Sequence, residues 1–170
     1  MTHPASSTWD GEPTPPLRRF LIAVLPVVAV SVAGSLVTTP NIPTWYAGLE
    51  KPGFTPPNWL FAPVWTALYA MMAYALWRIL ALPRNLPGRS AAVTAFFVQL
   101  VLNSLWSFAF FGANSPLAGL IVIAALIVAI LATIHAFWRL DRIAALLLAP
   151  YLAWVIYATA LNAAIWQLNP

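Results

Sequence analysis

The sequence predicts an all-α integral membrane protein, a bundle of five transmembrane helices, on three observations: its composition, the spacing of its charges and its turn residues. Of the 170 residues, 62% are hydrophobic and only 7% are charged. A helix crosses the hydrocarbon core of a bilayer with roughly 20 apolar residues, and several stretches of the chain of about that length or more carry no charge. These stretches lack the alternation of barrel strands, so helices are favoured.

The first span follows a polar segment. Residues 1–16 are rich in Pro, Ser and Thr and are expected to form a disordered tail. Residues 20–39 carry no charge. With Arg18 and Arg19 before it, this run could be a twin-arginine signal peptide. However, the apolar part of a signal peptide is usually only ~7 to 15 residues long. We therefore expect a retained helix over about residues 17–39, the first part of a membrane domain that covers residues 17–170.

Four further spans follow from the other charge-free stretches, residues 59–77, 90–138 and 143–170. Residues 112–116, Gly-Ala-Asn-Ser-Pro, are a run of turn formers that divides the second of these stretches into two helices. The predicted helices cover about residues 59–82, 90–111, 117–138 and 143–167.

The cations lie almost entirely on one side of the predicted membrane. With five spans, the N-terminal tail and the second and fourth loops share one side, which carries all the arginines, whereas the other side has only Lys51. By the positive-inside rule, the N-terminus is cytoplasmic and the C-terminus faces out. The pI near 10.0 is thus a topology signal, and we expect no nucleic-acid partner.

The first loop, residues 40–58, is unusual for a connection between spans because it combines aromatic residues, prolines and a Glu-Lys pair. Ordinary loops between spans are short, polar and replaceable. An aromatic loop at a membrane surface therefore suggests a lid over a binding site. The residues expected to form this lid are Trp45, Lys51, Pro52, Phe54, Pro56 and Pro57.

Three tryptophans inside spans, Trp65, Trp106 and Trp154, predict a cavity beneath the lid. An indole N–H within the bilayer has no water to bond, so it needs an internal partner or a ligand. The other tryptophans of the spans lie near span ends, where a membrane interface explains them.

Polar residues within the spans point to the same cavity. Gln99 and Asn103 share a helical face with Trp106, and this face should point into the bundle because polar side chains are costly in lipid. The alternative is hydrogen bonding between helices, which we favour for Gln99 and Asn162 taken alone. Further residues expected to line the pocket are Tyr69, Tyr151 and Ala158.

The sequence offers few residues suited to acid–base catalysis or to metal binding. No two carboxylates can meet in the bundle, and Asp141 is expected to pair locally with Arg139 and Arg142. His135 stands alone, so we expect no metal site and no obligatory cofactor. An odd number of spans also argues against a transporter built from two equal inverted halves. No span carries a charge of the kind that lines an ion channel.

Three stretches, residues 45–69, 99–112 and 150–162, carry motifs whose order and spacing persist across several helices. They resemble the TspO/MBR family, also called the tryptophan-rich sensory protein, translocator protein or peripheral benzodiazepine receptor family, over about residues 20–169. The resemblance implies a five-helix protein of a bacterial cell membrane, commonly dimeric, that binds porphyrins such as protoporphyrin IX and haem. Some members also bind cholesterol and benzodiazepine-type drugs.

The resemblance also implies roles for particular residues. Trp65 and Trp154 fall where bacterial relatives carry tryptophans proposed to act in light-dependent breakdown of protoporphyrin IX, because an indole can donate an electron to an excited porphyrin. Ala158 falls where a small residue leaves room for the ligand, Asn103 matches a polar pocket position, and Tyr46 belongs to the lid and the ligand site. The cholesterol-associated motif of animal members is missing here.

Three function classes share this pocket, and the sequence does not separate them. We favour a sensor or receptor that binds tetrapyrroles and regulates tetrapyrrole metabolism or a stress response. The alternatives are a light-dependent porphyrin-degrading enzyme and a porphyrin, lipid or sterol transporter. The expected partners are a tetrapyrrole ligand, membrane lipid and a second copy of the chain.

Small residues of the first span bear on assembly. Ala29 and Ala33, with Ser31 and Ser35, could form a homodimer seam or could equally pack within one bundle. The resemblance favours the homodimer. Because the first span has no internal aromatic residue, we expect it to contribute least to the pocket.

Overall fold

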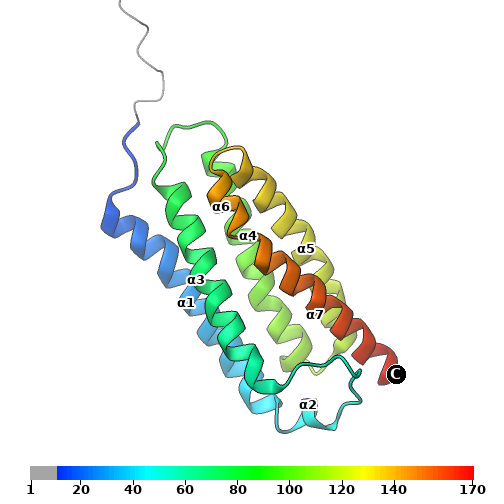
Figure 1. Ribbon diagram of the computed structural model, residues 1–170. Coiled ribbons are helices and arrows are strands. Elements are labelled where there is room, and N and C mark those ends of the chain that lie inside the picture. Colours follow the sequence, from blue (N-terminus) through cyan, green and yellow to red (C-terminus); the bar gives the residue numbers. More distant parts are fainter. Residues whose placement is uncertain (1–10) are drawn as a thin grey trace, which may run out of the picture.

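The computed structural model describes residues 11–170 and confirms the predicted bundle of five membrane-spanning helices. Figure 1 shows long helices packed side by side, with the lid segment and the C-terminus at one end of the bundle. Five helical segments are long and apolar enough to cross a membrane: Pro16–Asn41, Asn58–Leu80, Arg89–Gly112, Pro116–Trp138 and Arg142–Leu168. Residues 1–10 of the predicted tail lie outside the described residues.

The described chain contains five long helices and four short ones. The long ones are α1 (Pro16–Asn41), α3 (Phe61–Leu80), α4 (Arg89–Ser107), α5 (Pro116–Trp138) and α7 (Ala149–Leu168). The short ones are α2 (Trp45–Gly48) in the lid, the 3₁₀-helix η1 (Asn58–Leu60), the π-helix η2 (Phe108–Gly112) and α6 (Arg142–Leu146).

The turn predicted between the third and fourth spans is confirmed, and its residues explain where α5 begins. The Ser115 hydroxyl accepts a hydrogen bond of 3.2 Å from the Ala118 amide and so caps the helix. Pro116 occupies the first turn, where no N–H donor is needed.

The third span ends in a π-helix. The Ala113 amide reaches back five residues to the Phe108 carbonyl at 2.8 Å, whereas an α-helical bond reaches back four. Such bulges occur frequently at functional sites. This one presents two buried rings, Phe110 and Phe111, to the lid end of the bundle.

The fifth span, predicted over about residues 143–167, is confirmed as Arg142–Leu168, but it is built from two helices with a break between them. α6 ends at Leu146, a turn follows at residues 147–148, and α7 carries Pro150 in its first turn. Proline has no N–H for a helical hydrogen bond and its ring clashes with the carbonyl four residues earlier, which here belongs to Leu146. The first turn of a new helix avoids both costs.

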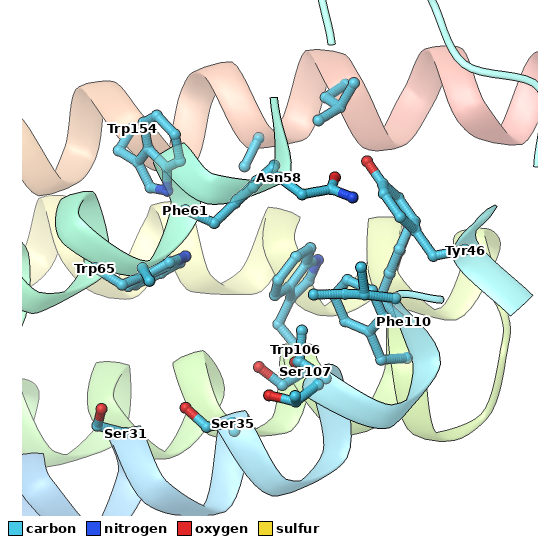
Figure 2. Close-up of a pocket in the computed structure, with 18 of the residues that line it drawn as sticks. Ser31, Ser35, Tyr46, Asn58, Phe61, Trp65, Trp106, Ser107, Phe110 and Trp154 are labelled. Carbon is cyan, nitrogen blue, oxygen red and sulfur yellow. The ribbon is translucent and has the colours of Figure 1, made fainter. Parts of the chain in front are cut away.

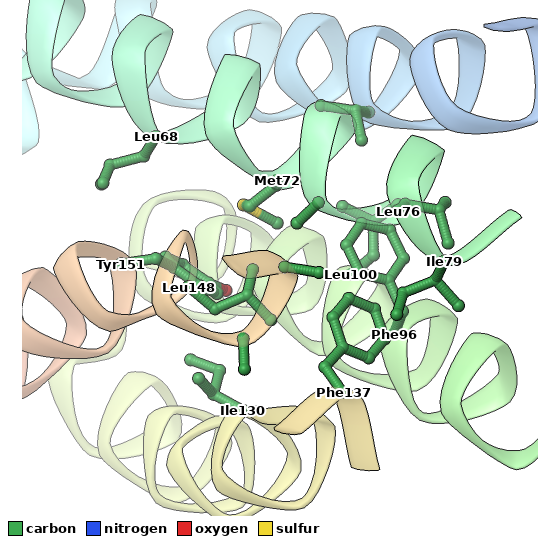
Figure 3. Packing of buried hydrophobic residues seen from close by; sticks show 14 of the residues in the cluster. Leu68, Met72, Leu76, Ile79, Phe96, Leu100, Ile130, Phe137, Leu148 and Tyr151 are labelled. Carbon is green, nitrogen blue, oxygen red and sulfur yellow. The ribbon is translucent and has the colours of Figure 1, made fainter. Parts of the chain in front are cut away.

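The core lies between α3, α4, α5 and the junction of α6 with α7, as Figure 3 shows. Its largest fully buried side chains include Met72, Leu76, Phe96, Phe137 and Tyr151. The rings of Phe96 and Phe137 stack with centroids 6.1 Å apart. The exposed faces of the long helices are also rich in Leu, Val and Ile, which suits contact with lipid.

An ion pair joins distant segments at the arginine-rich end. Arg78 Nε donates to Asp141 Oδ2 at 2.8 Å, so the expected local pairing of Asp141 with its flanking arginines was wrong. Burial works to raise the pKa of Asp141, but the hydrogen bond from Arg78, the Ala144 and Ile143 amides and the charge of Arg78 together hold that pKa below its ordinary value. Asp141 also caps α6 through those two amides.

The predicted tail ends earlier than residue 16. Arg89 is buried, and its guanidinium needs acceptors there. It donates to the carbonyls of Ile79 and Leu80 and, at 2.9 Å, to the hydroxyl of Thr14. Thr14 is consequently buried, and Pro13 beside it forms an isolated bridge with Pro83.

Candidate ligand-binding site

A cavity of about 280 Å³ lies beneath the lid. Figure 2 shows it between α1 on one side and α7 on the other, with Tyr46 of the lid at one end. Six of the predicted ligand-binding residues line it: Tyr46, Trp65, Tyr69, Trp106, Trp154 and Ala158.

Aromatic rings form much of the cavity wall. Trp65 on α3 and Trp154 on α7 both border the same space (Figure 2). The ring of Phe61 contacts that of Trp154 edge-on, with centroids 5.9 Å apart. The ring centroids of Trp65 and Tyr69 are 5.3 Å apart. Rings in these arrangements present both faces and edges to the cavity, which suits a flat, conjugated ligand.

The three predicted pocket tryptophans differ in their hydrogen bonding. Trp106 Nε1 donates to Asn162 Oδ1 at 3.3 Å, so its N–H is satisfied by the protein. Asn162 also donates to the Pro116 carbonyl at 2.8 Å and thus joins three helices, as expected for interhelical bonding. The indole N–H groups of Trp65 and Trp154 have no hydrogen-bond partner among the described residues, which leaves them able to donate to a ligand.

A hydrogen-bonded chain lies behind the cavity wall. The Tyr69 hydroxyl donates to Asn103 Oδ1 at 2.8 Å, and Asn103 Nδ2 donates to the Tyr151 hydroxyl at 3.1 Å. Asn103 and Tyr151 are buried and do not line the cavity, contrary to expectation. Asn103 uses its amide to join α3, α4 and α7, so it positions Tyr69 instead of facing the ligand.

Gln99 also does not line the cavity. Its side chain is 1% exposed, and neither amide atom has a hydrogen-bond partner among the described residues. The sequence placed it correctly on the buried face of its helix. The sequence did not show that the Gln99 amide has no hydrogen-bond partner among the described residues.

Of the residues named in advance for the lid, Tyr46 alone reaches the cavity, but Ile42 and Asn58 of the same loop, which the sequence did not single out, also line it. Tyr46 is buried against Phe110 and Phe111, and Trp45 packs edge-on against the same two rings. Lys51 covers Tyr46 from outside, with Nζ 4.8 Å from the ring centroid. Burial, and secondly the proximity of Tyr157, raise the pKa of Tyr46, which therefore stays a neutral phenol.

No metal centre is apparent: among residues 11–170, no group of three or more His, Cys, Asp or Glu could hold an ion. The site is thus an aromatic cavity with a few uncharged polar groups. A family model described as TspO/MBR family matches residues 22–167, nearly the whole described chain. The chain belongs to the TspO/MBR family.

Relatives named TspO or translocator protein are similar over most of their length. The chain is 46% identical to the tryptophan-rich protein TspO of Archaeoglobus fulgidus over 90% of this chain and 98% of that protein. It is 46% identical to the protein of the same name from Chlorobaculum tepidum, over 84% and 90% of the two chains. It is 36% identical to the translocator protein of Homo sapiens, over 74% and 75%.

In this TspO/MBR protein α1 forms a large part of the cavity, and the expectation that the first span contributes least was wrong. The cavity-lining residues of α1 are Ser31, Gly34, Ser35, Thr38 and Thr39. A Cβ atom at Gly34 would lie 3.3 Å from Ser107 Oγ, so the glycine permits close approach to the end of α4. The recurrence of hydroxyls at residues 31, 35 and 39 was a signal of this face, because polar side chains avoid lipid.

The lid of this family member is tied to α7 at two places. The Tyr157 hydroxyl donates to the Phe54 carbonyl at 2.7 Å. Near the C-terminus, Asn169 and the Glu50 backbone exchange two hydrogen bonds, each 3.0 Å long. These hydrogen bonds, together with the packing of Trp45 and Tyr46 against Phe110 and Phe111, hold the lid over the cavity.

Proposed function

We propose that this TspO/MBR protein is a membrane receptor or sensor that binds tetrapyrroles such as protoporphyrin IX or haem in the cavity under the lid. The observation that carries this proposal is the pair of indoles, Trp65 and Trp154, that border one apolar cavity with unused N–H donors. The names of its relatives, sensory protein and translocator protein, support a receptor or sensor at the level of the family. Its role is the regulation of tetrapyrrole metabolism or of a stress response.

The residues present fit a tetrapyrrole in chemistry. The macrocycle is flat and apolar and stacks on aromatic rings. Its carboxylates would accept hydrogen bonds from hydroxyls, and α1 supplies Ser31, Ser35 and Thr38 along one wall. The cavity volume, about 280 Å³, lies just below the range of ~300 to 1,000 Å³ for small-molecule pockets. A four-ring macrocycle is large for this space, so the lid must open to admit it.

Tryptophan fluorescence tests the proposal. Protoporphyrin IX added to the purified protein is expected to quench the emission with saturation. The double variant Trp65→Leu, Trp154→Leu should lose most of the saturable part. A matched control is Trp59→Leu, Trp166→Leu, because both indoles are exposed and neither lines the cavity. Equal residual quenching in the two double variants would overturn the proposed contact.

A second candidate function, light-dependent breakdown of the porphyrin, is favoured by the same two indoles. Proximity to an excited porphyrin is what electron donation from an indole needs, and no acid or base group is required. Illumination of the complex in air should then give new product spectra that depend on Trp65 and Trp154. Unchanged porphyrin would leave binding as the function.

We also propose that the lid end faces outside a bacterial cell membrane, because the arginines gather at the opposite end. The chain has no cysteine, so single cysteines report orientation without background. Gly53→Cys in the lid should react with an impermeant maleimide added to intact cells, and Pro87→Cys in the opposite loop should not. The reverse pattern would invert the proposed orientation.

A further inference from the structure

A second hollow runs between α1 and α3 on the outer surface of the bundle, with a volume of about 610 Å³. In Figure 1, α1 diverges from α3 toward its N-terminal end. The hollow is more open than the cavity under the lid and shares three wall residues with it, Ser31, Thr66 and Tyr69. We call it the α1–α3 groove.

The walls of the α1–α3 groove are apolar along most of its length. On α1 they run from Phe20 to Val32, and on α3 they include Ala70 and Ala73, whose small side chains leave the groove deep. Twelve residues of α-helix rise by about 18 Å. One leaflet contributes about half of the ~30 Å hydrocarbon core. The groove thus matches the length of hydrocarbon in one leaflet.

The end of the groove near the arginine-rich loops is aromatic and lies beside a cation. Trp77 and Tyr74 line it there, with ring centroids 5.9 Å apart and the rings stacked. Arg19 is not itself a wall residue, but its guanidinium lies over the ring of the wall residue Trp77, 5.1 Å from the ring centroid. Arg19 Nε is buried and has no hydrogen-bond partner among residues 11–170. Arg19 also has no ion-pair partner within that part of the chain.

A buried guanidinium N–H calls for an anionic acceptor, because leaving it unpaired costs free energy. The planar fork of arginine matches the oxygens of a phosphate, with which it forms paired, charge-assisted hydrogen bonds. Arg18, exposed beside Arg19, adds a second positive charge at this end. A phosphate that also carries a chain of one leaflet's length satisfies both parts of the groove.

We propose that the α1–α3 groove binds one membrane phospholipid with an anionic headgroup, whose phosphate contacts Arg19 and whose acyl chain lies along α1 and α3. Anionic lipids are concentrated in the leaflet on the cytoplasmic side, where the arginine-rich end is placed by its charge. The proposal does not depend on the tetrapyrrole ligand, because Arg19, Trp77 and Ala70, which carry it, do not line the cavity.

Native mass spectrometry of the detergent-purified protein tests this proposal. Phosphatidylglycerol and phosphatidylcholine with identical chains are titrated separately. We expect one phosphatidylglycerol to be retained at least fivefold more strongly than phosphatidylcholine. Arg19→Gln should abolish that preference. Arg84→Gln, which removes the same charge from an exposed position at the same end outside the groove, should keep it.

A separate variant tests the part of the groove that we propose holds the acyl chain. Ala70→Leu fills the groove from an exposed position on α3, so folding is undisturbed, and retention of the lipid should fall at least fivefold. A thermal unfolding curve like that of the unmodified protein checks the fold of each variant. Equal retention of the two lipids, preferential retention of a sterol, or the same loss in Arg84→Gln as in Arg19→Gln would each overturn the proposal.

Discussion

The Tyr157 hydroxyl donates a 2.7 Å hydrogen bond to the backbone carbonyl of Phe54 and so ties the lid to α7. The ring of Phe54 also lies edge-on to Tyr157, with centroids 6.3 Å apart. Tyr157 thus holds the lid over the cavity without lining it. Opening of the lid must break this contact.

Tyr157→Phe is therefore expected to speed ligand exchange. A neutral hydrogen bond contributes about 0.5 to 1.5 kcal/mol, which corresponds to about a two- to tenfold change in rate. Porphyrin association and release, measured by stopped-flow quenching, should both accelerate, and the equilibrium affinity should change less than either rate. Tyr74→Phe at the opposite end of α3 is the control. Unaltered release in Tyr157→Phe would mean that the ligand leaves by another route.

Ala158→Leu is expected to reduce ligand affinity at least fivefold. Ala158 lines the cavity one turn after Trp154, and a larger side chain there overpacks the site at a typical cost of about 1 to 3 kcal/mol. The matched control is Ala160→Leu on the exposed side of the same helix. Titration of both variants with protoporphyrin IX is the measurement. If they bind alike, the ligand does not occupy the space beside Ala158.

Asn103→Leu is expected to lower stability by about 1 to 3 kcal/mol, because it leaves the hydroxyls of Tyr69 and Tyr151 without their shared partner. Gln99→Met, one turn earlier on α4, should have little effect or be stabilising, since the Gln99 amide has no partner among the described residues. Thermal unfolding in detergent compares the two. A larger loss of stability for Gln99→Met than for Asn103→Leu would contradict this prediction.

The Arg78–Asp141 pair predicts a loss of stability in acid. The folded-state pKa of Asp141 is depressed, so its contribution is present above the unfolded value of about 4 and is lost as pH falls through the lower folded value. Asp141→Asn keeps an N-cap oxygen but removes the charge. Asp141→Asn should lower the free energy of unfolding by about 1 kcal/mol or less at pH 7. It should also reduce the loss of stability between pH 7 and pH 3.

Unfolding curves of the two proteins at several pH values provide the measurement for Asp141. Glu50→Gln serves as the control, since the exposed Glu50 has no ion pair among the described residues. Parallel stability profiles for Asp141→Asn and the unmodified protein would rule out this pair as the source of acid sensitivity.

The predicted homodimer can be tested with single cysteines. Ser31, Gly34 and Ser35 line the cavity, which leaves the exposed Ala29 as the small residue of α1 best placed for a seam. We expect Ala29→Cys to crosslink between subunits in native membranes, and Ile121→Cys, exposed on α5, to remain monomeric. Crosslinking at residue 121 but not at residue 29 would place the seam away from α1.

Local features of the sequence determined the five spans and several lining residues of the cavity. Charge-free length fixes a membrane helix because an ionised side chain in lipid is costly. The aromatic lid and the tryptophans within the spans were also visible in the sequence, because an indole N–H in the bilayer needs a partner. Pro150, which breaks the fifth span, was a local signal that the prediction did not use.

Only the tertiary structure decided which groups meet. Asp141 pairs with Arg78 across 63 residues, and Asn103 joins two tyrosines from different helices. The cavity-facing hydroxyls of α1 likewise depend on which helices lie beside it. The physical reason is that lipid is as apolar as the core, so both faces of a membrane helix are apolar and periodicity alone does not fix how each helix is rotated against its neighbours.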